Sequence, residues 1–335
     1  MPSATFFLLT LLVAAAAFAL AMLVGNDYLF FAGYVVLQFV VLATAWNILG
    51  GYCGYVNFGT AAFFAIGAYT AVVLHKLGAN PGYISGGLAF LQPLFPLSIP
   101  ALVAVGGLIA GIIGLGMGYL TLRLRGVFFA IATLAMAVVL QTLIINWDFV
   151  GGSRGAYIIR PDNLALFGFK LGYIQYLVLV MLLLAVIALS IARAIERSRL
   201  GYGLASIRDD ELAAEAAGVP TLRIKLVATT VSGALMGMAG APFPYYIGYV
   251  EPAATFGLPY AVNAIAMPMI GGTTSWGGPL IGAILLGSLQ QIATVTISSA
   301  ANLLIVGVLL VMFVIIAPNG ILGVAHDWWG SEAKT

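Results

Sequence analysis

Charged side chains concentrate in one part of this chain, between Arg193 and Lys225. The sequence holds 13 Lys and Arg and 11 Asp and Glu among 335 residues, and eleven of these charges fall in that stretch. Its centre, IRDDELAAEAAGV at residues 207–219, places four carboxylates around a run of alanines. Carboxylates and alanines in this order suit electrostatic and apolar contact with a partner, so the chemistry that they offer is binding.

The segment predicts a helix of about two turns, near residues 210–217. Asp209 is the expected N-cap, and Asp210 and Glu211 complement the positive end of the helix. Gly218 supplies the C-terminal stop, because glycine adopts the backbone conformation that commonly ends a helix.

The predicted helix has two different faces. Glu211 and Glu215 share one face, where Arg208 can offset their repulsion. Another face consists of Leu212, Ala213, Ala216 and Ala217. An isolated helix shorter than about 12–15 residues is marginal in water. The alanine-lined face therefore predicts a groove in a partner protein, and a solvated surface helix in a long loop is the alternative.

Few other residues could do chemistry. Cys53 is the only cysteine, which excludes an internal disulfide, and neither His75 nor His326 has neighbours at metal-ligand spacing. The chain lacks the G-x-x-x-x-G-K-[ST] phosphate loop, and no converging acids and bases occur in its apolar runs. We therefore expect no catalytic residue, no metal and no cofactor bound by this chain, and the missing basic patch argues against nucleic acid.

Membrane-spanning helices must position these residues. Charged residues make up 7% of the chain and hydrophobic residues 62%, whereas a soluble domain has roughly a quarter of charged residues. The apolar residues form continuous runs near the roughly 20 residues that a helix needs to cross a bilayer. Continuous runs exclude a β-barrel, whose strands alternate. The sequence thus predicts an all-α polytopic membrane protein.

Ten apolar runs are candidate spans, and the expected number of transmembrane helices is about eight to ten. The first has no Lys or Arg ahead of it and is longer than the 7–15-residue core of a secretory signal, so we expect it to be retained. The eighth is short and holds Pro268, which favours a broken or re-entrant segment. The candidates are residues 6–24, 31–49, 52–74, 98–121, 127–146, 173–192, 226–249, 259–270, 278–298 and 301–318.

Lys and Arg in the short loops predict the orientation. The 193–225 loop carries six of them and the 122–126 turn two, and counting spans puts these two connections on one side of the membrane. The 147–172 loop falls on the other side. We expect residues 193–225 to be a cytoplasmic loop that contains the short helix, within a single transmembrane domain over residues 1–335. In the ten-span arrangement both termini are cytoplasmic.

Two glycine-rich segments interrupt the apolar pattern, at residues 50–69 and 271–287. Each places glycines with hydroxyl or amide residues at a helix start at membrane depth. Paired interrupted segments point to an internal duplication around a central solute path; their similarity is weak, so two unrelated broken segments stay open as well. The residues that we expect on the path are Asn57, Thr60, Tyr69, Gly271 and Gly272, although a polar side chain there equally fits an interhelical hydrogen bond.

Five segments carry further motifs in a fixed order: GYVNFGTAAFFAIGAYTA (54–71), RLRGVFFAIATLA (123–135), SRLGYGLASIRDDELAAEAAGVPTLRIKLVATTVSGALMGMAGA (198–241), GGTTSWGGPLIGA (271–283) and APNGILG (317–323). Together they resemble the permeases of ABC importers for branched-chain amino acids, in particular the M-type subunit. The resemblance runs over most of the chain. Thr60 departs from the pattern, because the family often has His there.

The resemblance implies partners and a location. In that family the loop docks as a coupling helix into a cleft of a cytoplasmic ABC ATPase, so Ile207 to Gly218 would be the docking element. A homologous second permease subunit, a periplasmic or extracellular substrate-binding protein and a bacterial plasma (inner) membrane follow in the same way, and ATP would be used by the ATPase subunits. The solute would be a branched-chain or related small amino acid. Urea or short-chain amides are the alternative solutes, and an ion-coupled secondary transporter is the alternative mechanism.

Overall fold

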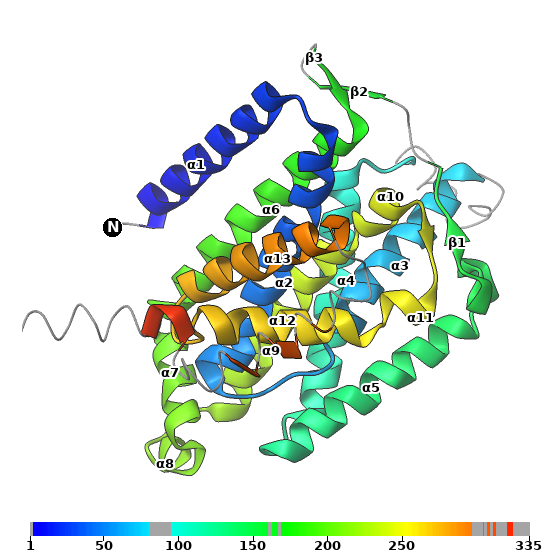
Figure 1. Cartoon of the computed structure of the whole chain (residues 1–335). Coiled ribbons are helices and arrows are strands. Elements are labelled where there is room, and N and C mark those ends of the chain that lie inside the picture. The colour runs from blue at the N-terminus through cyan, green and yellow to red at the C-terminus, as the bar shows by residue number, and fades with distance from the viewer. Residues whose placement is uncertain are drawn as a thin grey trace, which may run out of the picture.

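The computed structural model of the chain is built mainly of helices (Figure 1). It describes residues 3–80, 95–159, 163–166, 169–296, 304, 307–308, 311–312 and 320–323. The helices are α1 (Ser3–Val24), α2 (Asp27–Cys53), α3 (Thr60–Ala79), α4 (Ile99–Thr121), α5 (Val127–Ile145), α6 (Tyr173–Glu196), α7 (Arg199–Asp209), α8 (Glu211–Ala216), α9 (Thr221–Gly240), α10 (Phe243–Ile247), α11 (Pro252–Thr255), α12 (Leu258–Gly271) and α13 (Gly277–Thr296). Two 3-10 turns, η3 (Asp148–Val150) and η4 (Gly152–Arg154), and four short strands complete it: β1 (Ala156–Tyr157), β2 (Asn163–Leu166), β3 (Phe169–Gly172) and β4 (Tyr249–Val250).

Nine helical segments in the described part of the chain are long and apolar enough to cross a membrane. They correspond in order to the first nine predicted spans, which confirms the all-α polytopic class. The eighth contains α12, only 14 residues long, with Pro268 inside the helix near its end. The tenth predicted span, residues 301–318, lies largely outside the described residues.

The predicted boundary between the second and third spans is wrong. The expected spans were 31–49 and 52–74, whereas α2 continues to Cys53 and α3 begins at Thr60. Gly54 ends α2 with a φ of 76°, in the left-handed region that favours glycine. Residues 54–59 are non-helical and are called the inner segment below. The turn-forming residues Gly54 and Asn57 interrupt the helix here, although they lie within an apolar run of the sequence.

Close backbone contact holds the centre of the bundle together. Small residues of α4 and α9 face each other: a Cβ on Gly237 would meet the Cβ of Ala110 at 2.2 Å. Helix α3 joins them, since a Cβ on Gly67 would lie 1.9 Å from the carbonyl oxygen of Gly237. Helices in lipid gain most from such close packing, which small residues allow. These glycines therefore let α3, α4 and α9 approach one another closely.

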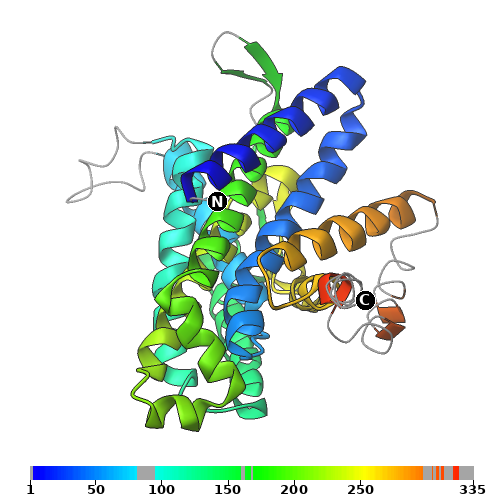
Figure 2. The ribbon, with the colours of Figure 1, turned by 90° about the vertical axis from the view of Figure 1, so that its left-hand side faces the viewer.

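The two ends of the bundle carry different structures. Helices α7 and α8 lie at one end, and the strands lie at the other (Figures 1 and 2). Arg125, in the turn between α4 and α5, contacts Glu215 at the α8 end. This contact confirms that the 122–126 turn and the 193–225 loop share a side. At the other end β1 pairs with β4, Ala156 opposite Val250, so the connections after α5 and after α10 are joined.

Helices α1 and α5 lie at the periphery. Helix α1 packs against α6, and its Phe6 contacts Arg193, so its first turn lies toward the α7–α8 end. Only Phe129 and Thr133 of α5 are buried. Helices α2, α3, α6 and α9, in contrast, each bury a large part of their surface. The hydrophobic core therefore centres on these four helices.

Candidate functional site

The predicted short helix exists as α8, but its N-cap is Asp210 rather than Asp209. The carboxylate of Asp210 accepts hydrogen bonds from the N–H groups of Leu212 (2.9 Å) and Ala213 (3.0 Å), as an N-cap does. Asp209 is the last residue of α7. The prediction was wrong by one residue because Asp209 still belongs to α7. Asp210 is the single residue between α7 and α8, and it caps α8.

Gly218 ends α8 as predicted. Its φ is +86°, its N–H bonds to the carbonyl oxygen of Glu215 (3.0 Å), and the next N–H, of Val219, bonds to that of Ala214 (3.0 Å). This pair of hydrogen bonds is the Schellman arrangement, which turns the chain sharply after a helix. The turn directs the chain straight into α9.

The apolar face of α8 is exposed. Leu212 is 64% exposed, and Ala213, Ala216 and Ala217 are exposed with it. Only Ala214 is buried, and it faces the bundle. An exposed Leu among alanines, on a helix with fixed ends, leaves a small apolar surface open for contact. We call Leu212, Ala213, Ala216 and Ala217 the α8 surface.

The inner side of α8 is held by a buried ionic cluster around Glu211. Nζ of Lys225 lies 2.6 Å from Oε1 of Glu211, with the two side chains 3% and 13% exposed. The hydroxyl of Tyr55 donates to the other carboxylate oxygen, and Nζ of Lys225 also donates to that hydroxyl at 3.0 Å and to the carbonyl oxygen of Leu122 at 3.3 Å. We call Tyr55, Glu211 and Lys225 the inner cluster.

Arg125 rather than Arg208 offsets the charge of the acidic face. It contacts Glu211 at 3.6 Å and Glu215 at 3.2 Å. Arg208 pairs with Asp209 at 3.5 Å and packs over Gly54, so the sequence-based pairing was wrong. The reason is tertiary: the turn after α4 comes to the acidic face, which spacing within the loop could not indicate. Ile207 is buried on α7 and lies beneath the surface rather than on it.

The environment of Glu211 sets its charge. Burial alone would raise the pKa of this carboxyl group, but hydrogen bonds from Lys225 and Tyr55 and the charges of Lys225 and Arg125 outweigh it and hold the pKa below its ordinary value. Glu211 is therefore ionised at neutral pH. Burial and the hydrogen bond to Glu211 raise the pKa of Tyr55, so its hydroxyl keeps the proton that it donates.

Asn57 in the inner segment and Thr60 at the start of α3, both expected on the solute path, are buried and bonded locally. The Asn57 side chain accepts from the N–H of Gly59 (2.7 Å), and its carbonyl oxygen accepts from Nε1 of Trp46 (3.0 Å) and from the Thr60 hydroxyl (3.2 Å). These bonds form the turn that starts α3. In this conformation both side chains shape the backbone locally, which differs from the interhelical hydrogen bond that the sequence left as the alternative; their place on a solute path stays a prediction.

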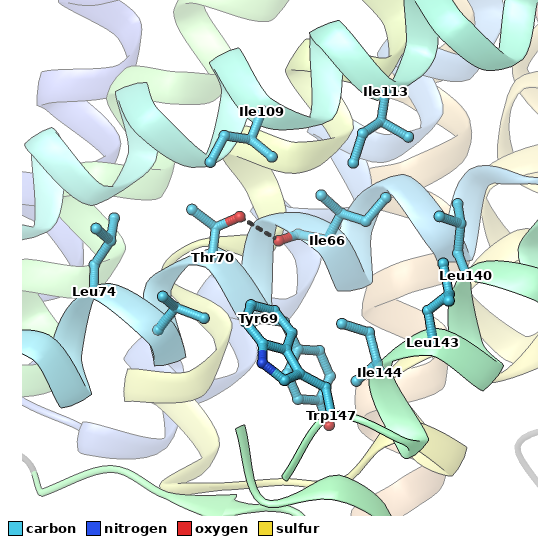
Figure 3. A pocket seen from close by; sticks show the side chains of 11 residues that line it. Ile66, Tyr69, Thr70, Leu74, Ile109, Ile113, Leu140, Leu143, Ile144 and Trp147 are labelled. Carbon is cyan, nitrogen blue, oxygen red and sulfur yellow. Dashed lines mark hydrogen bonds between the residues drawn. The ribbon is translucent and has the colours of Figure 1, made fainter. Parts of the chain in front are cut away.

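Tyr69, the third expected path residue, lines an apolar cavity of about 530 Å³ (Figure 3). Its hydroxyl is buried without a hydrogen-bond partner among the described residues, and the neighbouring Thr70 hydroxyl is bonded to Ile66. The cavity lies between α3, α4 and α5, and its lining is Ile66, Tyr69, Thr70, Val73, Leu74, Ile109, Ile113, Leu140, Leu143, Ile144 and Trp147. It suits an aliphatic group, and its lining contains no charged side chain for an ammonium or carboxylate.

Gly271 and Gly272 lie at a close approach between helices. A Cβ on Gly271 would meet the carbonyl oxygen of Gly278 at 1.8 Å, and Gly272 has a φ of 115°. The turn after them also packs on α2, because a Cβ on Gly51 would lie 2.5 Å from the carbonyl oxygen of Thr273. These glycines let α12, α13 and α2 meet. Their expected place on a solute path stays a prediction.

Sequence reasoning missed most of the inner cluster. Tyr55 was one letter in a glycine-rich motif, and Lys225 was counted only as a loop charge. The available signal was position: a lysine at the start of an apolar span must find a partner or reach the membrane surface. The contacts of Leu122 and Arg125 with the cluster gave no sequence signal, since nearly ninety positions or more separate them from their partners.

The sequence matches one family model and several known proteins. The model described as branched-chain amino acid transport system / permease component matches residues 28–316. The high-affinity branched-chain amino acid transport system permease protein LivM of Salmonella typhimurium is 30% identical over 338 residues, or 94% of this chain and 74% of that protein. LivM of Escherichia coli (strain K12) is 29% identical over 306 residues, 85% of this chain and 67% of that protein.

A further relative bears a different subunit name. The probable branched-chain amino acid transport permease protein LivH of Methanocaldococcus jannaschii is 27% identical over 286 residues, 81% of this chain and 84% of that protein. No solved structure matches the chain.

Proposed function

The chain belongs to the branched-chain amino acid transport permease family, and from this membership we propose that α8 is the surface on which an ATP-hydrolysing partner docks. The single observation that carries the proposal is that α8 is fixed on its inner side by the inner cluster and open on its outer side. A helix that is held this firmly yet exposes Leu212 is suited to receive force from a partner. The predicted docking element was Ile207 to Gly218. We propose that the part of it that contacts the partner is the α8 surface, together with the exposed carboxylate of Glu215 beside it, which we call the acidic rim.

Membership of the permease family indicates that the chain takes part in transport across a membrane. The chain is a multi-pass membrane permease, and its relatives are named as permeases of amino acid transport systems. We propose a branched-chain or related small amino acid as the solute, ATP used by separate ATPase subunits, and a substrate-binding protein on the outer side. Similarity to proteins named LivM and to one named LivH supports pairing with a second, homologous permease.

The direction of coupling follows from the two ends of the bundle. The end with α7 and α8 carries most of the basic residues, so by the charge rule for short loops it faces the cytoplasm, where ATP is available. The opposite end, where β1 pairs with β4, would receive the solute from the binding protein. ATP-driven movement at α8 would then open and close a path between these ends.

Capture of the ATPase tests the proposal. The chain is co-expressed with the ABC ATPase subunits of its source, purified in detergent, and the bound ATPase is measured. Leu212→Glu should lose bound ATPase, because a charge enters the apolar contact. Tyr157→Glu is the matched control, since Tyr157 is also exposed but lies at the opposite end. Equal capture by both variants would contradict docking at α8.

A further inference from the structure

The ammonium group of Lys225 joins four parts of the chain. Lys225 belongs to α9 and is 2% exposed. It donates to Glu211 of α8, to Tyr55 of the inner segment and to the carbonyl oxygen of Leu122 in the turn after α4, at 2.6, 3.0 and 3.3 Å. An ammonium group has three donors, so these contacts use all of them. One residue thus fixes α8 and the inner segment against α9.

The inner segment connects this cluster to the helices around the cavity. The N–H of Phe58 donates to the Thr133 hydroxyl of α5 at 3.2 Å, and Thr60, two residues on, is the first residue of α3. Helices α3 and α5 both line the apolar cavity. A displacement of Tyr55 therefore reaches both helices through a segment of few residues.

The other contacts of α8 are more exposed. Arg125 and Glu215 form an ion pair whose side chains are 49% and 42% exposed, and such pairs contribute little because water screens them. The Lys225–Glu211 pair is buried, and losing one partner of a buried pair leaves an uncompensated charge. The inner cluster is thus the stronger of the two connections between α8 and the bundle.

We propose that Lys225 is the positioning residue that couples α8 to the inner segment, so that movement of α8 by a docked ATPase is passed to the start of α3. The proposal rests on the proposed docking at α8 and goes beyond it by naming the transmitting group. The three acceptors are fixed to one ammonium, so α8 and Tyr55 move together while that contact lasts.

Three variants test the transmission. Lys225→Met keeps an unbranched side chain one atom shorter and removes all donors, and Tyr55→Phe removes one hydroxyl while its ring stays against Lys225 and Phe129. Lys76→Met is the matched control, because Lys76 donates to the Phe149 carbonyl oxygen, near the other end of the bundle. Each is reconstituted with the ATPase, the second permease and the binding protein. ATPase capture, ATP hydrolysis and solute uptake are measured.

Capture should be unchanged in Tyr55→Phe and Lys76→Met, in which Lys225 still holds Glu211, and weaker in Lys225→Met, so uptake is expressed per ATP hydrolysed by the complexes that form. Solute uptake per ATP hydrolysed should fall at least tenfold in Lys225→Met and severalfold in Tyr55→Phe, and stay at the wild-type value in Lys76→Met. Wild-type uptake per ATP in Lys225→Met would overturn the proposal. Loss of capture in Tyr55→Phe would also overturn it, since the cluster would then only hold α8 in place.

A covalent connection provides the rescue. In a Cys53→Ala background, Tyr55→Cys with Glu211→Cys should be uncoupled until a short bis-methanethiosulfonate reagent joins the two residues, forming one disulfide with each thiol and releasing methanesulfinate, and should then recover uptake per ATP. If the cross-linked double-cysteine variant stays uncoupled, the proposal is overturned. Failure of the docking proposal would be distinguished by the capture measurement, because the wild-type chain would then fail to capture the ATPase.

Discussion

The guanidinium carbon of Arg193 lies 3.9 Å from the centre of the Phe6 ring, and the same ring meets the Trp276 ring edge-on at 4.7 Å. Arg193 is buried near the end of α6, so its charge rests on aromatic faces. The neighbouring Glu196 accepts from the N–H of Trp276 at 2.7 Å. This group fastens the first turn of α1 to α6 and to the turn before α13.

Phe6→Ala should destabilise the protein through this contact. A desolvated cation–π pair contributes about 2 kcal/mol or more, so the melting temperature in detergent should fall by several degrees. Phe7→Ala is the matched control, because Phe7 is 39% exposed. Scanning fluorimetry measures the melting temperature of both variants. An equal decrease for the two substitutions would show that the Arg193–Phe6 contact adds no stability.

Asp210→Ala should loosen α8, whereas Asp209→Ala should not. Loss of an N-cap typically costs about 1 kcal/mol, and Asp210 caps α8 while Asp209 makes only an exposed pair with Arg208. We expect weaker ATPase capture from Asp210→Ala, measured as a higher dissociation constant. The same ranking should appear with Asp210→Lys and Asp209→Lys. A reversed ranking would reinstate Asp209 as the cap.

Glu215→Lys should leave membrane insertion intact and reduce ATP-coupled uptake. The substitution replaces the Arg125–Glu215 pair with two like charges on the rim of α8 and removes the acceptor of the Thr221 hydroxyl. Membrane-fraction yield and uptake into proteoliposomes are the measurements. Normal uptake by this variant would remove the acidic rim from the mechanism.

Gly237→Ala should fail to fold, and Gly116→Ala should fold at least as well as wild type. A Cβ at Gly237 would overlap Ala110 and the backbone of α4, whereas nothing lies within 4 Å of one at Gly116. Alanine also favours a helix by up to about 1 kcal/mol over glycine. The monodisperse fraction in size-exclusion chromatography should separate the two variants. Similar yields would mean that α4 and α9 can move apart at little cost.

The contribution of Glu211 to stability should fade in acid. Its pKa is lower in the folded protein than its ordinary value, so its ionised form stabilises the fold above that ordinary value, and this stabilisation is lost as pH falls through the lowered pKa. The difference in melting temperature between wild type and Glu211→Gln should be constant from pH 8 to 6 and shrink below about pH 4.5. A difference that grows in acid would contradict the lowered pKa.

The sequence predicted the class, the order of nine spans and the existence of α8, because these depend on local patterns. Runs of apolar residues report spans directly, and Gly218 after a short helical pattern marks the end of α8. The boundary of the third span was wrong because Gly54 and Asn57 form a turn inside an apolar run. Local chemistry therefore predicted elements better than it predicted their ends.

The inner cluster was beyond such reasoning. Tyr55 and Glu211 are 156 positions apart, and Lys225 is 170 positions from Tyr55. Contacts of this kind depend on how the helices pack, and packing depends on many glycines whose effect no window of sequence shows. Arg208 was a reasonable local partner for the acidic face, and tertiary structure placed Arg125 there instead.

Helix α5 is joined to neighbouring segments by hydrogen bonds near its two ends. Phe129 and Thr133 fix its start, and just past its end the Phe149 carbonyl oxygen accepts from Lys76 of α3. Between these points it faces the cavity with aliphatic side chains alone. An inward bend of α5 would therefore shrink the cavity next to Tyr69 by replacing one set of apolar contacts with another.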